Sequence, residues 1–360
     1  MFDSNDIDQI SKFMIHDFLP DVDTFKLDFA SGGEPLLNSS KTVDLIKRIK
    51  KNFEKENRLL QIWLCTNGTC HNMDTIKSLS HLGVQIGISL DGDKYIHDEM
   101  RIYKNGKGTY EDVIDFIQKV QSSSDIKRIS KQLWGLAVVT SKNNSLIDIH
   151  KHHRNIGFQS IQMKPVRLDS THELAFNLDN IIKLKKMISE YISFLYENLI
   201  LGDFKDVVMI ANDNHFIGKF LLRMINQNPV LMRCYAGRAK ISIAANGQIY
   251  PCDSFIGKKD FCIGNIWTGI DELKREEFFN QSVDNKDSCK KCWIKYICGG
   301  DCYHNAYMHN LRIDVPDTIT CEINKHIVKE LLMFVDELKR ENESYYEVLK
   351  HMLRLRSNLY

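Results

Sequence analysis

Cysteine is the residue type whose spacing in this 360-residue sequence points to chemistry. The chain has 10 cysteines, and all except Cys65 and Cys70 lie within residues 234–321. The later group contains a C-x2-C-x5-C-x3-C run made by Cys289, Cys292, Cys298 and Cys302. Close pairs of thiolates can hold one metal centre from a short loop, and more distant cysteines then complete its ligands. The spacing therefore predicts a cysteine-ligated metal domain.

Other roles for these thiols fit the sequence less well. Cytosolic thiols are normally kept reduced, so metal ligation explains them better than a disulfide framework does. Inert buried cysteine is a poor explanation because the spacing is too organised. Structural zinc stays open as an alternative, since four-thiolate zinc sites use similar close pairs.

A hairpin is expected just before the second of the late cysteines. The stretch Ala-Asn-Gly-Gln at 245–248 is a hairpin turn signal between the apolar segments 241–243 and 249–250. Cys252 then lies at the end of a small hairpin, where it is well placed to ligate. Cys262 stands apart from both groups.

Overall charge and hydropathy limit the classes of binding partner that we expect. Lysine plus arginine is 48 and aspartate plus glutamate is 47, which gives a net charge of +1 and no reason to expect nucleic acid or a membrane surface. No apolar run approaches the ~20 residues of a membrane span. The first residues are acidic and polar, unlike a secretory signal. We therefore expect a cytoplasmic protein with no nucleic-acid or membrane partner.

The first half of the sequence alternates between helical and strand periodicity. Helices are expected over 4–18, from 40, and over 76–82, 109–120 and 146–154, and strands over 25–29, 60–64, 84–90, 133–139 and 161–166. Helix–strand repeated five times favours parallel strands with right-handed crossovers, so ligands should bind at the C-terminal strand ends. The series begins with a helix, so a strand that should precede it is missing. Further helices are expected over 179–201, 207–226 and from 324 onward.

Three turn-rich loops follow three successive expected strands. They are Ser31-Gly32-Gly33-Glu34-Pro35, Thr66-Asn67-Gly68 and Asp91-Gly92. Glycines let the backbone approach a ligand closely, and acidic oxygens suit an ammonium group. Simple tight turns are the structural alternative for the first and third loops.

Together these motifs resemble the radical S-adenosylmethionine (SAM) superfamily with a C-terminal SPASM domain. The hairpin and cysteine order is similar to SPASM, while the GGEP, TNG and SLDG loops and the His97-Asp98 and Arg101 pattern are similar to the superfamily's strand-end motifs. The resemblance implies an α/β fold, a partial (β/α)6 barrel lacking its first strand, then a small cysteine-rich domain and a C-terminal helix. It places the barrel at 1–200, a helical connector at 201–233, the SPASM domain at 234–323 and the last helix at 324–360.

The resemblance also implies cofactors and their residues. One [4Fe-4S] cluster would be bound by Cys289, Cys292, Cys298 and Cys321. A second would be bound by Cys234, Cys252 and Cys302, with either an open iron site or Cys262 as fourth ligand. SAM would contact the residues Gly32, Gly33, Glu34, Pro35, Asn67, Ser89, Asp91 and Arg101.

A third cluster is expected from the resemblance but is not encoded. The superfamily holds it with a C-x3-C-x2-C motif, and no cysteine precedes Cys65. Cys65 and Cys70 have the wrong spacing and lie at another strand end. An N-terminal truncation is the simplest interpretation, and a shortened inactive paralogue or a split protein stays open.

Two subfamilies compete for the function. Peptide maturases, which install thioether or carbon–carbon crosslinks, are favoured by Cys234-Tyr235-Ala236-Gly237 and Phe255-Ile256-Gly257. Sulfatase maturases, which oxidise cysteine or serine to formylglycine, are favoured by Tyr250-Pro251-Cys252-Asp253, in which Asp253 would be a base. Hairpin capping is the structural alternative for Asp253. A non-catalytic electron-transfer or peptide-binding paralogue stays open. The implied partners are a peptide or protein substrate and a reductant such as flavodoxin or ferredoxin.

One histidine cluster offers no site. His150, His152 and His153 lie on a short expected helix, where residues i and i+2 do not share a face. A solvated surface is expected for them.

Overall fold

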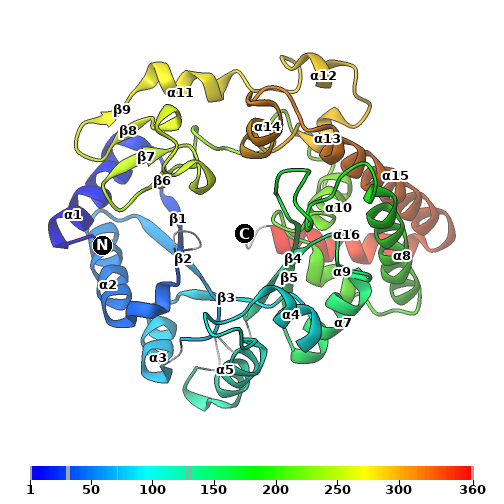
Figure 1. Cartoon of the computed structure of the whole chain (residues 1–360), viewed down its shortest axis with the longest axis horizontal. Helices are drawn as coiled ribbons and strands as arrows, with labels where there is room; N and C mark the ends of the chain where they lie inside the picture. Colours follow the sequence, from blue (N-terminus) through cyan, green and yellow to red (C-terminus); the bar gives the residue numbers. More distant parts are fainter. Residues whose placement is uncertain (1, 30–32, 71, 127–128, 130–131, 358–360) are drawn as a thin grey trace. The chain divides into compact units, whose positions relative to one another are not determined.

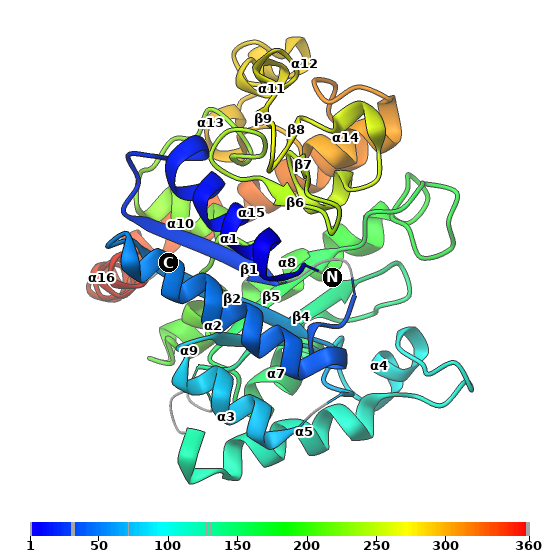
Figure 2. The same cartoon turned by 90° about the vertical axis from the view of Figure 1, so that its left-hand side faces the viewer.

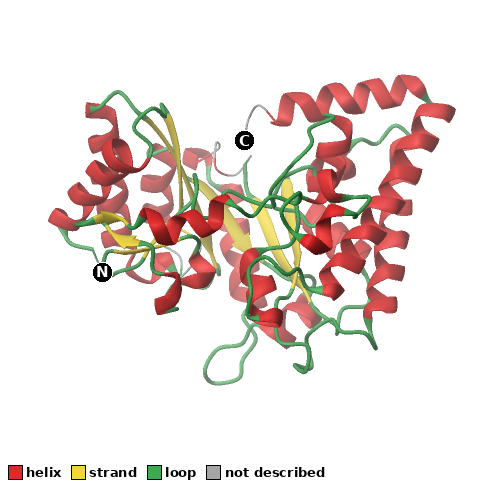
Figure 3. Cartoon of the chain, turned by 90° about the horizontal axis from the view of Figure 1, so that it is seen from above, coloured by secondary structure: helices red, strands yellow, loops and turns green. Residues whose placement is uncertain are grey.

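The structure is a computed structural model that describes residues 2–29, 33–70, 72–126, 129 and 132–357. Its large sheet has the strand order β1-β2-β3-β4-β5, and β1 pairs with β2, β2 with β3, and β4 with β5, each time in parallel (yellow in Figure 3). The strands are β1 Thr24–Phe29, β2 Leu59–Thr66, β3 Gln85–Ser89, β4 Trp134–Val139 and β5 Ser160–Pro165. The α/β class and the parallel strands expected of a partial barrel are confirmed.

Helices connect these strands as the periodicity predicts. In α2, for example, Val43, Ile46, Ile49 and Phe53 recur at helical spacing and are buried. The helices of the first part are α1 Ser4–Lys12, η1 Phe13–Phe18, η2 Pro35–Asn38, α2 Ser39–Lys55, α3 Met73–His81, α4 Lys94–Met100, α5 Tyr110–Ser122, η3 Ser124–Ile126, α7 Leu146–Ile156 and α8 Ile181–Ile200. None of the described helices is both long and apolar enough to cross a membrane.

Helix boundaries differ from expectation in three places. The helix over 4–18 changes to a π-helix at Phe13, where four apolar side chains are buried. The stretch over 207–226 is two helices, α9 Lys205–Ile210 and α10 Gly218–Ile225. They are separated where the Asn212 side-chain oxygen accepts from the Asn214 amide at 3.1 Å, a local bond that competes with helix.

The C-terminal segment holds two helices rather than one. Helix α15 spans Thr318–Glu341 and α16 spans Glu343–Ser357. Asp317 caps the start of α15, so that this helix begins before residue 324. Asn342 separates the two helices, and its side chain accepts from the Tyr345 amide at 3.3 Å.

The chain divides into two compact units. Unit 1 comprises Met1–Ile88, Asp112–Gln132 and Cys234–Gln281, and unit 2 comprises Ser89–Glu111, Leu133–Arg233 and Ser282–Tyr360. In unit 1, α1 lies beside α2 (Figure 2). In unit 2, α8 lies along α15 (Figure 1).

Unit 1 also contains the predicted hairpin. Strands β6 Ser242–Ile243 and β7 Gln248–Tyr250 pair antiparallel, and Gly247 in the turn has φ +77°. Strands β8 Gly264–Asn265 and β9 Gly269–Ile270 extend the small sheet. The helices of residues 234–310, divided between the two units, are η4 Asp253–Phe255, η5 Lys259–Phe261, α11 Glu272–Phe279, α12 Asp287–Lys290, α13 Lys295–Cys298 and α14 Tyr303–Asn310.

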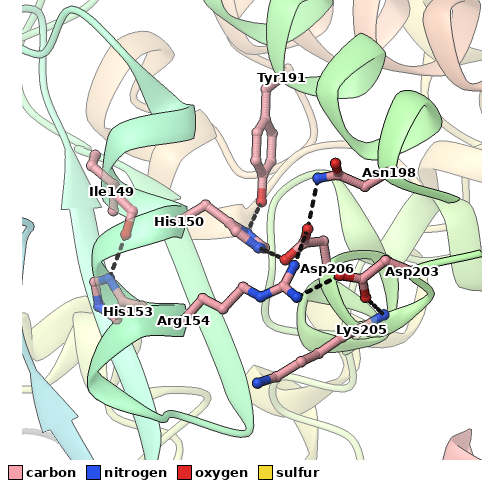
Figure 4. A network of polar contacts seen from close by, with 9 residues as sticks. All are labelled: Ile149, His150, His153, Arg154, Tyr191, Asn198, Asp203, Lys205 and Asp206. Carbon is pink, nitrogen blue, oxygen red and sulfur yellow. Dashed lines mark hydrogen bonds and ion pairs between the residues drawn. The ribbon is translucent and has the colours of Figure 1, made fainter. Parts of the chain in front are cut away.

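The expectation of a solvated histidine surface on α7 is wrong. His150 and His153 are fully buried in unit 2. The ring of His150 bonds the Tyr191 hydroxyl at 2.6 Å and the Asp206 carboxylate at 2.8 Å (Figure 4). Arg154 and Asn198 bond the second carboxylate oxygen of Asp206. Helical spacing places i and i+3 on one face, and that face turns inward here.

Asp206 joins α7, α8 and α9 through one buried charge. Burial alone would raise its pKa, but the His150 hydrogen bond and charge and those of Arg154 outweigh that effect, and the pKa is lowered. A carboxyl whose folded pKa is lowered stabilises the fold above its unfolded pKa, and the contribution disappears as the pH falls through the folded value. The stabilisation is therefore complete at neutral pH.

Asp206→Asn should lower the free energy of unfolding by about 3 kcal/mol at pH 7, because it leaves the buried His150 and Arg154 groups without their charged partner. The deficit should narrow below about pH 4, where the wild-type carboxyl also begins to protonate. Urea denaturation followed by circular dichroism at pH 7 and pH 3 measures both. An equal deficit at the two pH values would show that the charge is not what stabilises the network.

Candidate functional site

Glu34 ties together the ends of strands β1 and β2 within unit 1. Its Oε1 accepts hydrogen bonds from the Leu36 amide at 2.9 Å and the Thr66 hydroxyl at 2.7 Å. Its Oε2 accepts from the Asn67 amide at 2.7 Å. Bonds to an ionised carboxylate are stronger than neutral ones. The acid of the GGEP loop therefore holds the TNG loop in place.

The rest of these two loops has the turn geometry that the glycines predict. The Asn67 side-chain oxygen accepts from the amide and the hydroxyl of Thr69, at 2.9 and 2.8 Å. Gly68 has φ +72° and Gly33 has φ +128°, values that favour glycine.

Two further members of the GGEP loop complete this account. Pro35 opens the short helix η2, where its missing N–H costs nothing. Gly32 lies outside the described residues.

Asp91, from the SLDG loop, is a buried ion-pair residue of unit 2. Its carboxylate accepts from Arg101 Nε at 2.6 Å and Nη2 at 3.2 Å, and from the Val138 amide at 2.9 Å. Asp91 is 2% exposed, and Ser89, at the end of β3, is also buried. Both predicted ligand contacts, Asp91 and Arg101, thus bind each other and fix the strand end.

His97 completes this arrangement in one tautomer. Burial lowers its pKa to about 4, with Asp91 opposing and Arg101 adding to the effect, so the ring is neutral at pH 7. Its Nδ1 accepts the Asp91 amide at 3.3 Å, so Nε2 carries the proton and donates to Thr109 Oγ1 at 3.0 Å. The Thr109 hydroxyl donates in turn to the Arg101 carbonyl. The His-Asp and Arg motif is therefore a local scaffold for the loop.

Arg101→Met should lower the free energy of unfolding by about 3 kcal/mol, because it leaves the Asp91 carboxylate buried without its cation. The double variant Asp91→Asn with Arg101→Met should recover more than half of this loss. Urea denaturation of the full chain measures both.

Lys186→Met is the matched control, because Lys186 is 77% exposed and pairs only with Glu190. A loss in Arg101→Met no larger than in this control would contradict the role of the ion pair.

Four thiols of unit 2 come from separate short elements. Cys289 lies in α12, Cys292 follows it, Cys298 ends α13, and Cys321 lies in the first turn of α15. After Cys298 the chain passes through glycines 299 and 300, both with positive φ. A Cβ on Gly299 would lie 2.8 Å from the Met232 backbone, so only glycine fits there.

These four thiols act on one another electrostatically. Burial raises the pKa of Cys321 to about 12, and the charges of Asp301, Cys298 and Cys289 contribute to that rise. Burial also raises the pKa of Cys289, to which Cys298 and Cys292 add. The structure therefore brings Cys289, Cys292, Cys298 and Cys321 into one neighbourhood.

The remaining predicted ligands lie in two places. In unit 2, Arg167 Nη1 donates to Cys302 Sγ at 3.2 Å. In unit 1, Cys252 directly follows the hairpin, and the Gly237 amide donates to the Pro251 carbonyl at 3.2 Å. The segment after Cys234 is thereby joined to the residue before Cys252.

Asp253 and Cys262 lie beyond the hairpin in unit 1. Asp253 begins η4, and its carbonyl accepts from the Ile256 amide. The Cys262 thiol donates to the Gly264 carbonyl at 3.4 Å.

The donor chemistry of the four-thiol group fits an iron–sulfur cluster. Cluster irons are held by cysteine thiolates, and a metal that binds these thiols must displace their protons. Among the described residues no three His, Cys, Asp or Glu side chains converge tightly enough to hold a single metal ion. The four thiols suit the ligand set of an iron–sulfur cluster and also that of a four-thiolate zinc site.

Family models match both parts of the chain. Residues 2–115 match the 4Fe-4S single cluster domain, and residues 234–293 match SPASM, the iron-sulfur cluster-binding domain. These two regions are therefore similar to iron–sulfur domains, in the order that the resemblance to radical SAM proteins with a SPASM domain implies. The cysteines that suit a third cluster are nevertheless not in the first match, which contains only Cys65 and Cys70.

Similar proteins include anaerobic sulfatase-maturating enzymes of two types. The cysteine-type anaerobic sulfatase-maturating enzyme of Clostridium novyi (strain NT) is 27% identical over 306 residues, which are 81% of this chain and 76% of that protein. The serine-type enzyme of Bacteroides thetaiotaomicron is 22% identical over 329 residues, 86% of this chain and 77% of that protein.

Solved structures show the same fold. Native anSMEcpe with bound AdoMet and Kp18Cys peptide has a TM-score of 0.73 at 19% identity, covering 93% of this chain and 90% of that one. Streptococcus suis SuiB bound to S-adenosylmethionine has a TM-score of 0.54 at 14% identity, covering 89% of this chain and 70% of that one.

Sequence patterns found the thiols and loops but missed their polar surroundings. The contact of Arg167 with Cys302 and the burial of Lys219 and Lys286 joined no motif and gave no signal in the sequence.

Cys321→Ser should lower the bound iron and sulfide, because a cluster held by Cys289, Cys292, Cys298 and Cys321 would lose a ligand. Cys65→Ser is the matched control and should retain both. Iron, zinc and sulfide analysis after anaerobic purification measures the result. A colourless, zinc-loaded and iron-free wild type would overturn the cluster assignment.

Proposed function

We propose that this protein takes part in SAM-dependent radical oxidation of a cysteine or serine side chain in a peptide substrate to formylglycine. The observation that carries the proposal is its similarity to both cysteine-type and serine-type anaerobic sulfatase-maturating enzymes over most of their length. The sequence motifs favoured a crosslinking peptide maturase, and the relatives favour the sulfatase-maturase alternative.

The loops at the strand ends would hold SAM. Bound SAM supplies the radical that begins such oxidations. In unit 1, the Glu34 carboxylate fixes the backbone of the GGEP and TNG loops for the approach of a ligand. In unit 2, the Asp91–Arg101 pair fixes the SLDG loop in the same way. Their role in this proposal is to position backbone groups, with no proton transfer assigned to them.

The cysteine set would hold two [4Fe-4S] clusters. Cys289, Cys292, Cys298 and Cys321 form the first ligand set of the proposal. Cys234, Cys252 and Cys302, with Cys262 as an alternative fourth ligand, form the second. No step is assigned to a third cluster, because residues 2–115 do not provide three suitable cysteines.

Asp253 is the proposed base. It follows Cys252 directly, so a carboxylate lies next to a proposed cluster ligand in the chain. A carboxylate there could take the proton of a substrate thiol or hydroxyl. The remaining partners of the proposal are the peptide itself and a reductant such as flavodoxin or ferredoxin.

The test is to incubate the anaerobically reconstituted protein with SAM, dithionite and a matched pair of peptides carrying cysteine or serine at one position. Oxidation to formylglycine creates an aldehyde, so the product should react with a hydrazide probe. Mass spectrometry should show loss of two hydrogens from serine, or the same loss with sulfur replaced by oxygen from cysteine.

Loss of two hydrogens without hydrazide reactivity would instead identify a crosslink. Formation of 5′-deoxyadenosine without any peptide product would contradict the choice of substrate. Its absence would favour the non-catalytic alternative.

A further inference from the structure

Lys219 is a buried ammonium with no acceptor in unit 2. It lies on α10 and is 5% exposed. Among the described residues its side chain has no hydrogen-bond or carboxylate partner, and its nitrogen lies 4.6 Å from the centre of the Phe220 ring. Burial, and then the charge of Arg233, lower the pKa of Lys219 well below its usual value, because desolvating the charged form is costly without an anion. An anion close to Lys219 would remove that cost.

Among the described residues, the largest charge effects on Lys219 come from three arginines and one thiol. Arg233, Arg223 and Arg167 act on it, and the Cys298 thiol is the one acidic group among its main electrostatic neighbours. Arg233 carries a buried Nη1 that has no hydrogen-bond acceptor in the described part of the chain. These four cations thus interact with one another, and one of them, Arg233, carries a buried donor with no acceptor among the described residues.

The geometry directs these cations at the cysteine loop. Arg167 Nη1 lies 3.2 Å from Cys302 Sγ. Arg223 Nη1 donates to the carbonyls of Ile297 and Cys298, at 2.8 and 3.1 Å, and so holds the end of α13.

The other side of the loop has a cation as well. Lys286 is 3% exposed, and its charge acts on the Cys289 thiol. Its ammonium would lie 3.7 Å from a Cβ placed on Gly300.

We propose that Arg167, Lys219 and Lys286 compensate the negative charge of thiolate-ligated iron–sulfur clusters at Cys289, Cys298 and Cys302, and thereby raise their reduction potential. Each electron added to a cluster makes it more negative by one unit, so nearby cations stabilise the reduced form. The three side chains are positioning residues, because they act on the clusters through the ligating sulfurs. This inference rests on the cluster binding of the proposed function and is independent of the peptide substrate.

A substrate carboxylate is a weaker explanation of the same cations. Arg167 already contacts a cysteine sulfur, and Lys219 is buried near another. A ligand carboxylate that bound these two cations would have to compete with those thiols.

The experiment is an EPR-monitored redox titration of the holoenzyme with dithionite. Arg167→Gln and Lys219→Met should each make reduction harder, lowering its equilibrium constant by about tenfold. Arg167→Lys keeps the charge and should stay close to wild type. Arg340→Gln removes one charge at a side chain that is 69% exposed and should also match wild type.

The results for these variants distinguish an effect of side-chain charge from an effect of side-chain packing. Unshifted potentials in Arg167→Gln and Lys219→Met, with unchanged iron content, would overturn the inference, and so would an equal shift in Arg340→Gln. If Arg167→Gln loses iron while Arg167→Lys keeps it, charge is required and the inference stands. Equal loss in both variants would assign Arg167 to packing and overturn it.

Failure of the proposed function gives a different result. A protein that shows the expected potential shifts but makes no hydrazide-reactive peptide would retain this inference and lose the formylglycine assignment.

Discussion

Burial of thiols is the constraint on which the cysteine domain depends. A thiol such as Cys321, whose pKa burial raises to about 12, stays protonated in a metal-free chain and offers little to a fold. A metal that displaces the proton converts the same burial into binding energy. The cysteines sit on short elements: α12 and α13 have four residues each. Helices this short have little intrinsic stability, so ligation rather than helix formation must hold the loop together.

The acidic loop residues Glu34 and Asp91 hold the ends of the strands in place. Glu34 accepts three hydrogen bonds and Asp91 receives Arg101 and the Val138 amide. Backbone hydrogen bonding between strands stops where each strand ends. There the carboxylate accepts hydrogen bonds that keep the following loop in one conformation. Residues that look like ligand contacts in the sequence are therefore first of all scaffold residues, and a ligand would meet the backbone that they hold.

Sequence periodicity correctly predicts the elements that depend on residues close together in the chain. The parallel strands, the β6–β7 turn at Gly247 and the glycine that ends α7 follow from alternation and turn chemistry. The thiol group was predictable in its members, because close spacing restricts them. The His150–Asp206 pair was not, since its residues are 56 positions apart and the polar face of α7 turns inward only because Asp206 and Tyr191 receive it. Lys219 and Arg167 were missed for the same reason, as nothing local marks a cation that faces a distant sulfur.

The cationic side chains near the thiols indicate which kind of metal centre they suit, whatever the substrate is. A structural zinc site needs the negative charge of its thiolates to be balanced. It gains nothing from cations that favour one redox state, because zinc does not change its oxidation state. The cation at Cys302 is the exposed Arg167, whereas Lys219, which interacts electrostatically with Cys298, is buried, and its charged form is costly to maintain. Beside a metal centre that exchanges electrons, such cations would set how readily the centre accepts one. The inferred role of these side chains therefore depends on a redox-active centre at the thiols and would have no counterpart at a zinc site.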